Sequence, residues 1–348
     1  MRLPSRLALA AAIAFTATAC STPAAPPARP GPATPASSTA ASPGTTPPHP
    51  TTTRARITAD TARALHANEL GHIPILMYHR LTPHPTSVYE RTPADFTAEL
   101  TRLANEHYIP TTTAALTTRH LDLPPGTHPV VLTFDDGDPS IFTLTPHGDP
   151  APGTAIRILL DTAATHPGFT PTASLYVNQH PYGEPDGGPA LAWLHHHGFE
   201  IGNHTKTHTN LRTVTPAAAD TAISDGDTLI RHAIPGYQPT TLALPYGAHP
   251  HQENLTLHGS TYTYTGALLV GAGPAPSPYS TRFTPQSIPR IRSQTTGKES
   301  QYGSTHWLDL LAQPGSHLYT SDGDPTTITY PRSETTLAPD LTSQALAY

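Results

Sequence analysis

The chain has 348 residues, a length that allows one large domain or two ordinary ones with a sizeable core. Its formal net charge is −6, and Lys206 and Lys298 are its only lysines, so the composition excludes the basic surfaces that bind nucleic acids or acidic membranes. The single cysteine, Cys20, excludes a disulfide framework and a cysteine-based zinc site.

Residues 1–20 have the layout of a secretory signal. Two arginines precede an apolar run over 7–15, which is too short for a secure membrane span, and small residues then lead to Cys20. The cysteine at this junction resembles a bacterial lipobox, although Ala17 stands where leucine is usual, and predicts cleavage before Cys20 and lipid attachment to it. Ordinary secretion and a retained anchor are the alternatives. We therefore expect an extracellular protein that is lipid-anchored to the outer face of a bacterial cell membrane, or otherwise secreted.

Residues 21–56 are rich in Pro, Ala, Ser and Thr. Such a segment buries too little apolar surface to offset its ordering entropy, so we interpret it as a disordered tether.

The globular domain is expected over 57–348, where predicted strands alternate with helices, a pattern that indicates parallel pairing and an α/β barrel or a doubly wound sheet. In chain order, we expect a helix over 57–70, a strand over 73–79, a helix that begins at Thr92 and Pro93, a strand over 130–135, an insertion over 140–169 that is helical over 155–164, a strand over 173–177, a helix over 190–197, a strand over 199–201, a helix over 216–232, and strands over 240–244 and 266–270.

The strand predicted over 130–135 ends in two adjacent carboxylates. Its apolar, β-branched residues are typical of a strand buried on both faces, and Asp135 and Asp136 then precede Gly137. Removing two neighbouring carboxylates from water is costly unless a cation or hydrogen-bond donors meet them. We therefore expect the pair beside a positive charge at the mouth of the strand, where Gly137 allows both acids to address one site. The alternative is a turn in which both acids are solvated.

A second candidate site follows the strand predicted over 199–201. His204 and His208 are four residues apart, and on one face of a helical turn their ring nitrogens would converge on one ion. Catalytic groups of β/α folds gather at the carboxyl ends of strands, so two imidazoles and one carboxylate predict a three-ligand metal site with open positions. The alternative is a surface turn in a histidine-rich chain. A third stretch, Pro-Tyr-Gly at 245–247, follows another predicted strand and offers a free backbone N–H and an aromatic wall.

In this order, the three motifs resemble those of the polysaccharide deacetylases that carry the NodB homology domain. The resemblance rests on Thr-Phe-Asp-Asp-Gly at 133–137, His-Thr-x-x-His at 204–208 and Pro-Tyr-Gly at 245–247. Residues 73–80 look like the leading strand of the extracellular branch of that family. The resemblance implies a distorted (β/α) barrel of about seven strands, with the homology core over about 128–348.

The resemblance also implies a role for each motif residue. Asp135 corresponds to the general base, and the implied ligands of one divalent metal ion are Asp136, His204 and His208. Zinc is the expected metal, with cobalt, nickel and iron(II) as alternatives. The chemistry of the residues agrees, because a metal at Asp136 would polarise an acetyl carbonyl and acidify water whose proton Asp135 could take. The backbone N–H of Tyr246 is the implied donor to the oxyanion.

Two features depart from the family pattern. Ala243 stands where most members have the arginine that orients the base; Arg290 is the candidate substitute, with a surface arginine as the alternative interpretation. The late Leu-x-His motif that supplies a general acid is not evident in the sequence. His317 and His249 are candidates for that acid, although either is also explained as a surface histidine.

The predicted function is metal-dependent hydrolysis that removes acetyl groups from N-acetylated, or else O-acetylated, sugars of a cell-wall or extracellular polysaccharide and releases acetate. We expect a monomer that has no nucleic-acid partner and meets the membrane only through its N-terminal lipid. One alternative is a non-catalytic carbohydrate-binding lipoprotein that retains the fold. A less favoured one is a glycoside hydrolase, whose two carboxylates must flank the scissile bond about 5–9.5 Å apart, which adjacent acids do awkwardly.

Overall fold

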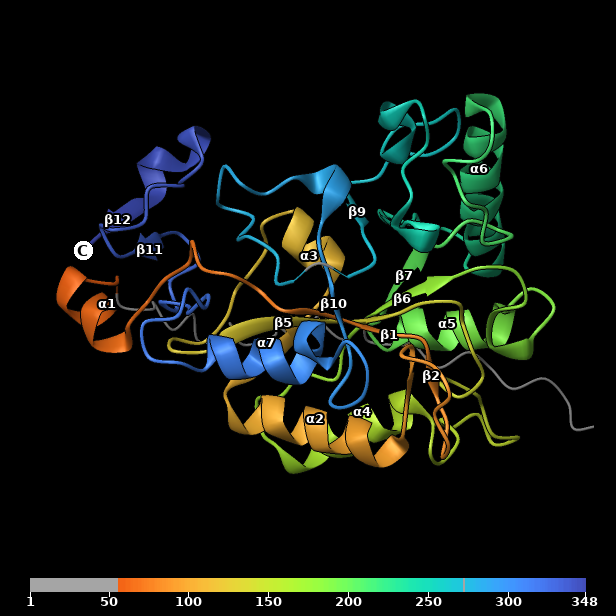
Figure 1. Ribbon diagram of the computed structural model, residues 1–348, viewed down its shortest axis with the longest axis horizontal. Helices are drawn as coiled ribbons and strands as arrows, with labels where there is room; N and C mark the ends of the chain where they lie inside the picture. The colour runs from red at the N-terminus through yellow and green to blue at the C-terminus, as the bar shows by residue number, and fades with distance from the viewer. Residues whose placement is uncertain (1–55, 272) are drawn as a thin grey trace, which may run out of the picture. The chain divides into compact units, whose positions relative to one another are not determined.

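The central strand of the protein is β5 (His128–Phe134), the apolar run that precedes the two carboxylates. The structure is a computed structural model that describes residues 56–271 and 273–348 (Figure 1). The predicted signal segment over 1–20, the lipid attachment at Cys20 and nearly all of the tether over 21–56 lie outside the described residues. None of the described helices is long and apolar enough to span a membrane.

Eight strands form the main sheet, and all of their pairings are parallel. Val131 in β5 pairs with β1 on one side and with β4 (Tyr108–Thr111) on the other, and β6 takes over that second side near the end of β5. Seven of the strands follow one another in the order β10 (Ile291–Arg292), β1 (Ile75–Tyr78), β5, β6 (Ser174–Val177), β7 (Glu200–Asn203), β8 (Thr241–Ala243) and β9 (Gly266–Leu268).

The two ends of this strand order approach each other. Ile288 lies just before β10 and forms a parallel bridge to Leu268 in β9, while β10 itself pairs with β1. The sheet therefore curls into the distorted barrel of about seven strands that was predicted.

Helices and short elements fill the connections between the strands (Figure 1). The α-helices are α1 (Ala59–Leu65), α2 (Pro93–Asn105), α3 (Thr113–Thr117), α4 (Ala155–Thr165), α5 (Gly188–His196), α6 (Pro216–Ala233) and α7 (Ser304–Leu311). Two small parallel pairs stand apart from the main sheet: β2 (Arg80–Leu81) with β3 (Glu90–Arg91), and β11 (Ile328–Tyr330) with β12 (Ala345–Ala347). The 3-10 helices are Pro181–Gly183, Pro245–Gly247, Glu253–Thr256, Pro285–Ser287, Ser300–Tyr302 and Pro339–Gln344.

Every strand and helix predicted from the sequence is present, with ends shifted by a few residues. Thr92 caps α2 as expected, because its hydroxyl accepts a hydrogen bond from the Asp95 N–H (3.0 Å). The helix expected over 57–70 is shorter, since His66 adopts a left-handed conformation (φ 52°) that ends α1. Four main-sheet or packing elements were not predicted, namely β4, α3, β10 and α7.

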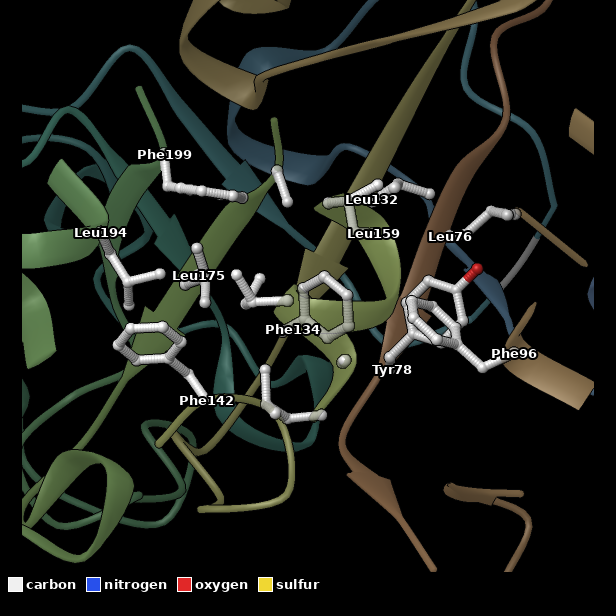
Figure 2. Close-up of a cluster of buried hydrophobic side chains, with 14 of the residues drawn as sticks. Leu76, Tyr78, Phe96, Leu132, Phe134, Phe142, Leu159, Leu175, Leu194 and Phe199 are labelled. Carbon is white, nitrogen blue, oxygen red and sulfur yellow. The ribbon is translucent and has the colours of Figure 1, made fainter. Parts of the chain in front are cut away.

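Alternate residues of β5 serve two different cores. Leu132 and Phe134 point outward into a cluster that α2, α4 and α5 cover, and in Figure 2 Phe134 lies between Leu175 on one side and the rings of Tyr78 and Phe96 on the other. The Phe134 ring is 5.1 Å from that of Tyr78. Aromatic residues bury large areas, so this outer cluster anchors the helices to the sheet.

The other face of the strands forms the barrel interior, where Leu116 of α3 packs among the buried side chains. Because side chains alternate along a strand, the inward set of β5 continues from Val131 through Thr133 to Asp135. The same alternation carries β1 from Ile75 to His79. The inward-facing residues at the carboxyl ends of the strands therefore meet at one mouth of the barrel, where polar groups can reach solvent. The buried members of the interior cluster are Ile73, Ile75, Leu116, Leu121, Leu123, Val131, Tyr176, Ala243, Leu268, Ala275, Ile288 and Tyr319.

A buried carboxylate joins the segment after α1 to the β11–β12 pair. Glu69 is 4% exposed and accepts hydrogen bonds from the Tyr319 hydroxyl (3.2 Å) and the Thr329 N–H (2.9 Å). Burial, together with the neighbouring Asp322, raises the pKa of Glu69 to about 8 against the lowering effect of these hydrogen bonds. Glu69 is therefore protonated in the folded protein at neutral pH.

We predict that Glu69 makes the free energy of unfolding fall as the pH rises from about 5 to about 8. The unfolded chain releases this proton near the ordinary pKa of 4.5, whereas the folded protein keeps it until about 8. The contribution is complete below the lower value and lost above the higher one. Glu69→Gln cannot ionise and should lack this part of the slope, a difference on the order of a few kcal/mol. Urea unfolding of both proteins across this pH range measures it, and parallel pH profiles would contradict the assignment.

Candidate active site

A cavity of about 350 Å³ opens at the mouth of the barrel, where β1, β5 and β7 end. It brings together the acids that follow β5 and the histidines that follow β7, as predicted for the carboxyl ends of parallel strands. The cavity is lined by His79, Arg80, Ser87, Tyr89, Glu90, Asp135, Asp136, Asp138, His204, His208, Tyr246 and Val270.

Arg290 holds Asp135 in place. Both side chains are fully buried, and the guanidinium donates two parallel hydrogen bonds to the carboxylate, from Nη1 to Oδ1 (2.8 Å) and from Nη2 to Oδ2 (2.7 Å). Nε of Arg290 also donates to the Leu269 carbonyl (2.6 Å), and Nη1 to the Thr133 hydroxyl (3.1 Å). Burial alone would raise the pKa of Asp135, but the charge of Arg290 and its hydrogen bonds hold that pKa well below its usual range. Asp135 is therefore an oriented, ionised carboxylate.

Arg290 thus binds the carboxylate of Asp135, and position 243, where the family usually has an arginine, is occupied by alanine. Ala243 is buried inside the barrel, and its carbonyl accepts a hydrogen bond from Nδ1–H of His204 (2.8 Å). A carbonyl only accepts, so this bond fixes the tautomer of His204 and leaves Nε2 with a free lone pair. Ala243 therefore positions the histidine through its backbone.

Three side chains offer ligand atoms to one point in the cavity. Oδ1 of Asp136 lies 3.5 Å from Nε2 of His204 and 3.7 Å from Nε2 of His208, and all three ligand atoms are within 4.8 Å of one another. Nε2 of His204 is buried without a hydrogen-bond partner among the described residues. Burial lowers the pKa of His204 and so favours the neutral imidazole, the form that binds metal. Two imidazole nitrogens, one carboxylate oxygen and an orphaned buried lone pair fit a divalent metal ion.

Asp136 is turned into this position by its own backbone. Its φ of 71° is left-handed, as is that of Gly137 after it, so the outward-facing position after Asp135 is redirected toward the cavity. The Asn178 amide then donates to Oδ1 of Asp136 (3.1 Å). Burial raises the pKa of Asp136, and the neighbouring charge of Asp135 adds to the effect. The predicted break in the strand is present, but it begins one residue before the glycine.

The prediction of a helical turn over 204–208 is wrong. The segment is an irregular turn with left-handed backbone at Thr205 (φ 57°) and His208 (φ 52°), which still brings the two imidazole centroids to 4.8 Å. Asn203 supports the turn by accepting a hydrogen bond from the Thr205 N–H (2.8 Å). Two left-handed residues replace the helical geometry that would place residues i and i+4 side by side.

His79 is a site residue that the sequence reasoning missed. It follows β1 as Asp135 follows β5, and its Nε2 lies 3.8 Å from Oδ2 of Asp135. Its Nδ1 is buried without a hydrogen-bond partner among the described residues. Burial lowers the pKa of His79, with the charge of Asp135 opposing, so the neutral form is favoured. The available signal was its position: an inward-facing residue directly after a buried strand.

Tyr246 forms part of the rim of the cavity. Its side chain is 63% exposed, and its ring centroid lies 4.6 Å from that of His208. The residue has a φ of 60°, and no hydrogen bond of the described residues uses its backbone N–H as donor. The N–H predicted as an oxyanion donor thus has no partner among the described residues and lies beside the three candidate metal ligands.

The two histidines considered as general acids lie elsewhere. His317 shares a hydrogen bond with Glu334 (2.8 Å from Nδ1 to Oε1) and lines a different cavity. His249 contacts the hydroxyls of Thr256 (3.2 Å) and Ser287 (3.1 Å). Neither side chain lines the cavity that contains Asp135.

Several solved structures resemble the chain at low identity. The Streptococcus pyogenes deacetylase PplD in complex with acetate is 18% identical over 70% of this chain and 99% of its own, with a TM-score of 0.49. BC0361, a polysaccharide deacetylase from Bacillus cereus, is 18% identical over 64% of each chain (TM-score 0.48). IcaB from Ammonifex degensii is 16% identical over 67% of this chain and 94% of its own (TM-score 0.47). No curated protein matches the sequence.

A family model described as polysaccharide deacetylase matches residues 122–264. The matched segment carries all three motifs found in the sequence, and with them the three metal-binding candidates and Asp135. It excludes His79, which follows β1, and Arg290, which precedes β10. Residues 122–264 are therefore similar to polysaccharide deacetylases, and this similarity includes the residues of the cavity that follow β5 and β7.

Proposed function

We propose that the protein uses one divalent metal ion, with zinc the first candidate and cobalt, nickel or iron(II) as alternatives, to remove acetyl groups from amino sugars of a cell-wall or extracellular polysaccharide. O-acetylated sugars are the second substrate class. One observation carries this proposal: an ionised, buried Asp135 lies beside a set of three metal donors in a single cavity. Hydrolysis of an unactivated amide needs both a base for water and an electrophile for the carbonyl.

Asp136, His204 and His208 would hold the metal ion. When bound, a divalent cation supplies a Lewis acid for the acetyl carbonyl and makes water a better nucleophile. Asn178 and the Ala243 carbonyl orient two of the three ligands from behind, the arrangement by which outer hydrogen bonds fix the direction of a donor atom.

Asp135 would accept the proton of the attacking water. Its two oxygens are directed by Arg290, and each retains a lone pair that the guanidinium does not use. Because its pKa is held low, Asp135 is ionised whenever the pH permits metal binding. A carboxyl group with so low a pKa readily passes the proton on to a stronger base.

His79 is that stronger base. Its neutral Nε2 lies 3.8 Å from Asp135, a gap that catalytic groups close when substrate is bound, so the proton can pass from the carboxyl group to the imidazole. His79 then donates it to the amine nitrogen as the C–N bond breaks, and the products are acetate and a free amine. The free N–H of Tyr246 would donate to the carbonyl oxygen as negative charge develops on it.

The alternative functions fit this site less well. A glycoside hydrolase needs two free carboxylates, but Arg290 engages both oxygens of Asp135, and Asp136 faces two imidazoles. A missing orienting arginine and a missing acid would support a non-catalytic carbohydrate-binding protein. Arg290 and His79 offer both groups, which supports an active enzyme.

We also propose that the enzyme acts outside the cell as a monomer that is tethered through a lipid on Cys20, or else secreted. The support is the sequence of residues 1–56 alone, where a secretory layout precedes a proline-rich tether.

The first test of the site removes one metal ligand at a time. Asp136→Ala, His204→Ala and His208→Ala each delete one of three donors, so bound metal should fall from about one ion per chain to a small fraction of that after dialysis. Elemental analysis by mass spectrometry measures the metal content. His249→Ala, a remote histidine, should retain the wild-type content. Full metal occupancy in any of the three ligand variants would disprove the assigned site.

The second test removes the base. Asp135→Asn should lower acetate release by at least about 100-fold while the metal content stays at the wild-type level, because Asp135 is not a ligand. The substitution also leaves Arg290 buried and uncompensated, so the free energy of unfolding should fall by about 3–5 kcal/mol. Circular dichroism establishes that the assayed protein is folded. Wild-type turnover by a folded, metal-loaded variant would exclude Asp135 as the base.

The third test uses the leaving group to separate proton donation from the rest of the reaction. His79→Gln should lower acetate release from an N-acetylated sugar by about 100-fold or more, because an amine must be protonated to leave. The same variant should keep most of its activity on 4-nitrophenyl acetate, whose phenolate leaves without a proton. His317→Gln, at a remote site, is the matched control for both substrates. An equal loss on amide and aryl ester would mean that His79 acts by another route.

A further inference from the structure

A chain of buried hydrogen bonds extends from the histidine turn, residues 204–208, to helix α6. It is formed by Asn203, Tyr264 and Asp227, each of which is exposed by 2% or less. None of the three lines the catalytic cavity or is one of the three candidate metal ligands. Buried polar groups are costly unless each is satisfied, and a satisfied network of them determines one conformation.

We propose that Asn203, Tyr264 and Asp227 are positioning residues of the metal site, which hold the histidine turn in the conformation that binds the ion. The inference rests on the proposed function, because it assumes a divalent metal ion at the three candidate ligands. It goes beyond that function by assigning part of the metal affinity to residues that do not touch the ion.

The side-chain amide of Asn203 can take only one orientation. Its oxygen accepts a hydrogen bond from the Thr205 N–H (2.8 Å), which can only donate, and its nitrogen donates to the Ile223 carbonyl (2.8 Å), which can only accept. The nitrogen also donates to the Tyr264 hydroxyl (2.7 Å). A rotated amide would place oxygen against oxygen and N–H against N–H. The amide therefore holds the backbone of Thr205 in one fixed direction.

Thr205 lies between the two histidines of the turn in the chain and is buried. Its φ of 57° is left-handed, a conformation that a β-branched residue adopts only when its surroundings impose it. The bond from its N–H to Asn203 acts at the start of the turn, and its hydroxyl accepts from the Thr209 N–H (2.9 Å) just beyond the end. Holding Thr205 therefore fixes the directions of both His204 and His208.

The hydroxyl of Tyr264 is oriented by Asp227. It donates to Oδ1 of Asp227 (3.1 Å), so its lone pairs are left to accept from the Asn203 amide. Burial and the charge of Asp227 raise the pKa of Tyr264, so the hydroxyl keeps the proton that this bond needs. Oδ2 of Asp227 is paired in turn with Nε of Arg231 (2.7 Å), one turn further along α6. The network thus ends in an ion pair on the helix.

Helix α6 approaches the histidine turn closely at Gly226. A Cβ atom there would lie 2.2 Å from Oδ1 of Asn203, so any larger residue would displace the amide. The Lys206 N–H in the turn also donates to the Ala222 carbonyl of α6 (3.3 Å). Glycine weakens a helix, and it is tolerated where another chain segment must come close. The turn is therefore docked directly on α6, and the network holds it there.

The test compares two neighbouring tyrosines that lose the same hydroxyl group. Tyr264→Phe removes an acceptor of the Asn203 amide, so the Kd for zinc should rise about tenfold, the lower end of the loss that is typical for groups that orient metal ligands. Tyr262→Phe is the matched control, because its ring stacks on that of Tyr264 (4.9 Å) and its buried hydroxyl donates to the Leu255 carbonyl (2.5 Å). The control should retain the wild-type Kd. Chelator competition measures the Kd of variants that circular dichroism shows to be folded.

Cobalt provides a second measurement that does not depend on activity. The visible absorption of Co(II) bound to the protein reports the geometry of its ligands, so Tyr264→Phe should change the spectrum and Tyr262→Phe should not. Asp227→Asn keeps an acceptor for the Tyr264 hydroxyl and should retain the wild-type Kd for zinc. Asp227→Ala removes that acceptor and should raise the Kd about as much as Tyr264→Phe does.

The two tyrosine variants decide the role of the network. Equal Kd values and identical cobalt spectra for both variants would overturn the positioning role. An equal rise in both Kd values would overturn it as well, because the loss of any buried hydroxyl would then suffice. Absence of stoichiometric zinc or cobalt from the wild-type protein would instead overturn the metal site of the proposed function, and this inference with it.

Discussion

The structure of the site depends on one buried ion pair, that between Asp135 and Arg290. Moving two charges out of water costs more than their attraction returns unless the geometry is good and their remaining hydrogen-bonding groups are satisfied. Here two parallel hydrogen bonds join the charges, and the Leu269 carbonyl and the Thr133 hydroxyl occupy two further guanidinium donors. Leu269 follows β9, Asp135 follows β5, and Arg290 precedes β10, so the pair also fastens together the strands that close the barrel.

The site is further shaped by backbone strain. Asp136, Thr205, His208 and Tyr246 all have left-handed φ values, and none of them is glycine. Each such residue costs about 1–3 kcal/mol, which a structure tolerates only where its surroundings determine the conformation. The result is identifiable for three of them, because the left-handed backbone turns Asp136 and His208 toward one point and leaves the Tyr246 N–H without a hydrogen-bond partner among the described residues. The side chains that would hold a metal ion are therefore directed toward one point by the protein itself.

Features that depend on a short stretch of sequence were predicted well. The apolar runs predicted the strands that carry the motifs, and the acids after β5 and the histidines after β7 were expected to meet because parallel strands end at one edge. The helical turn at 204–208 failed because spacing alone does not reveal left-handed backbone at Thr205. His79 was missed even though it obeys the same rule as Asp135. Its strand has a proline near its start and a single polar residue at its end, which gives a weaker signal than two adjacent carboxylates.

Arg290 was named as a candidate from the sequence, but its contact with Asp135 was not predictable from spacing, since 155 positions separate the two and only barrel closure brings them together. The segment that matches the family model ends before Arg290 and begins after His79, yet Asp135 is held by the first and lies beside the second. Both come from neighbours in the closed sheet: β1 pairs with β5 on one side and with β10 on the other. Arg290 can reach Asp135 because the barrel returns β10 to the side of β1. The surroundings of the motif residues therefore depend on closure of the whole barrel. The strand that completes the closure, β10, has only two residues and no apolar run by which the sequence could predict it.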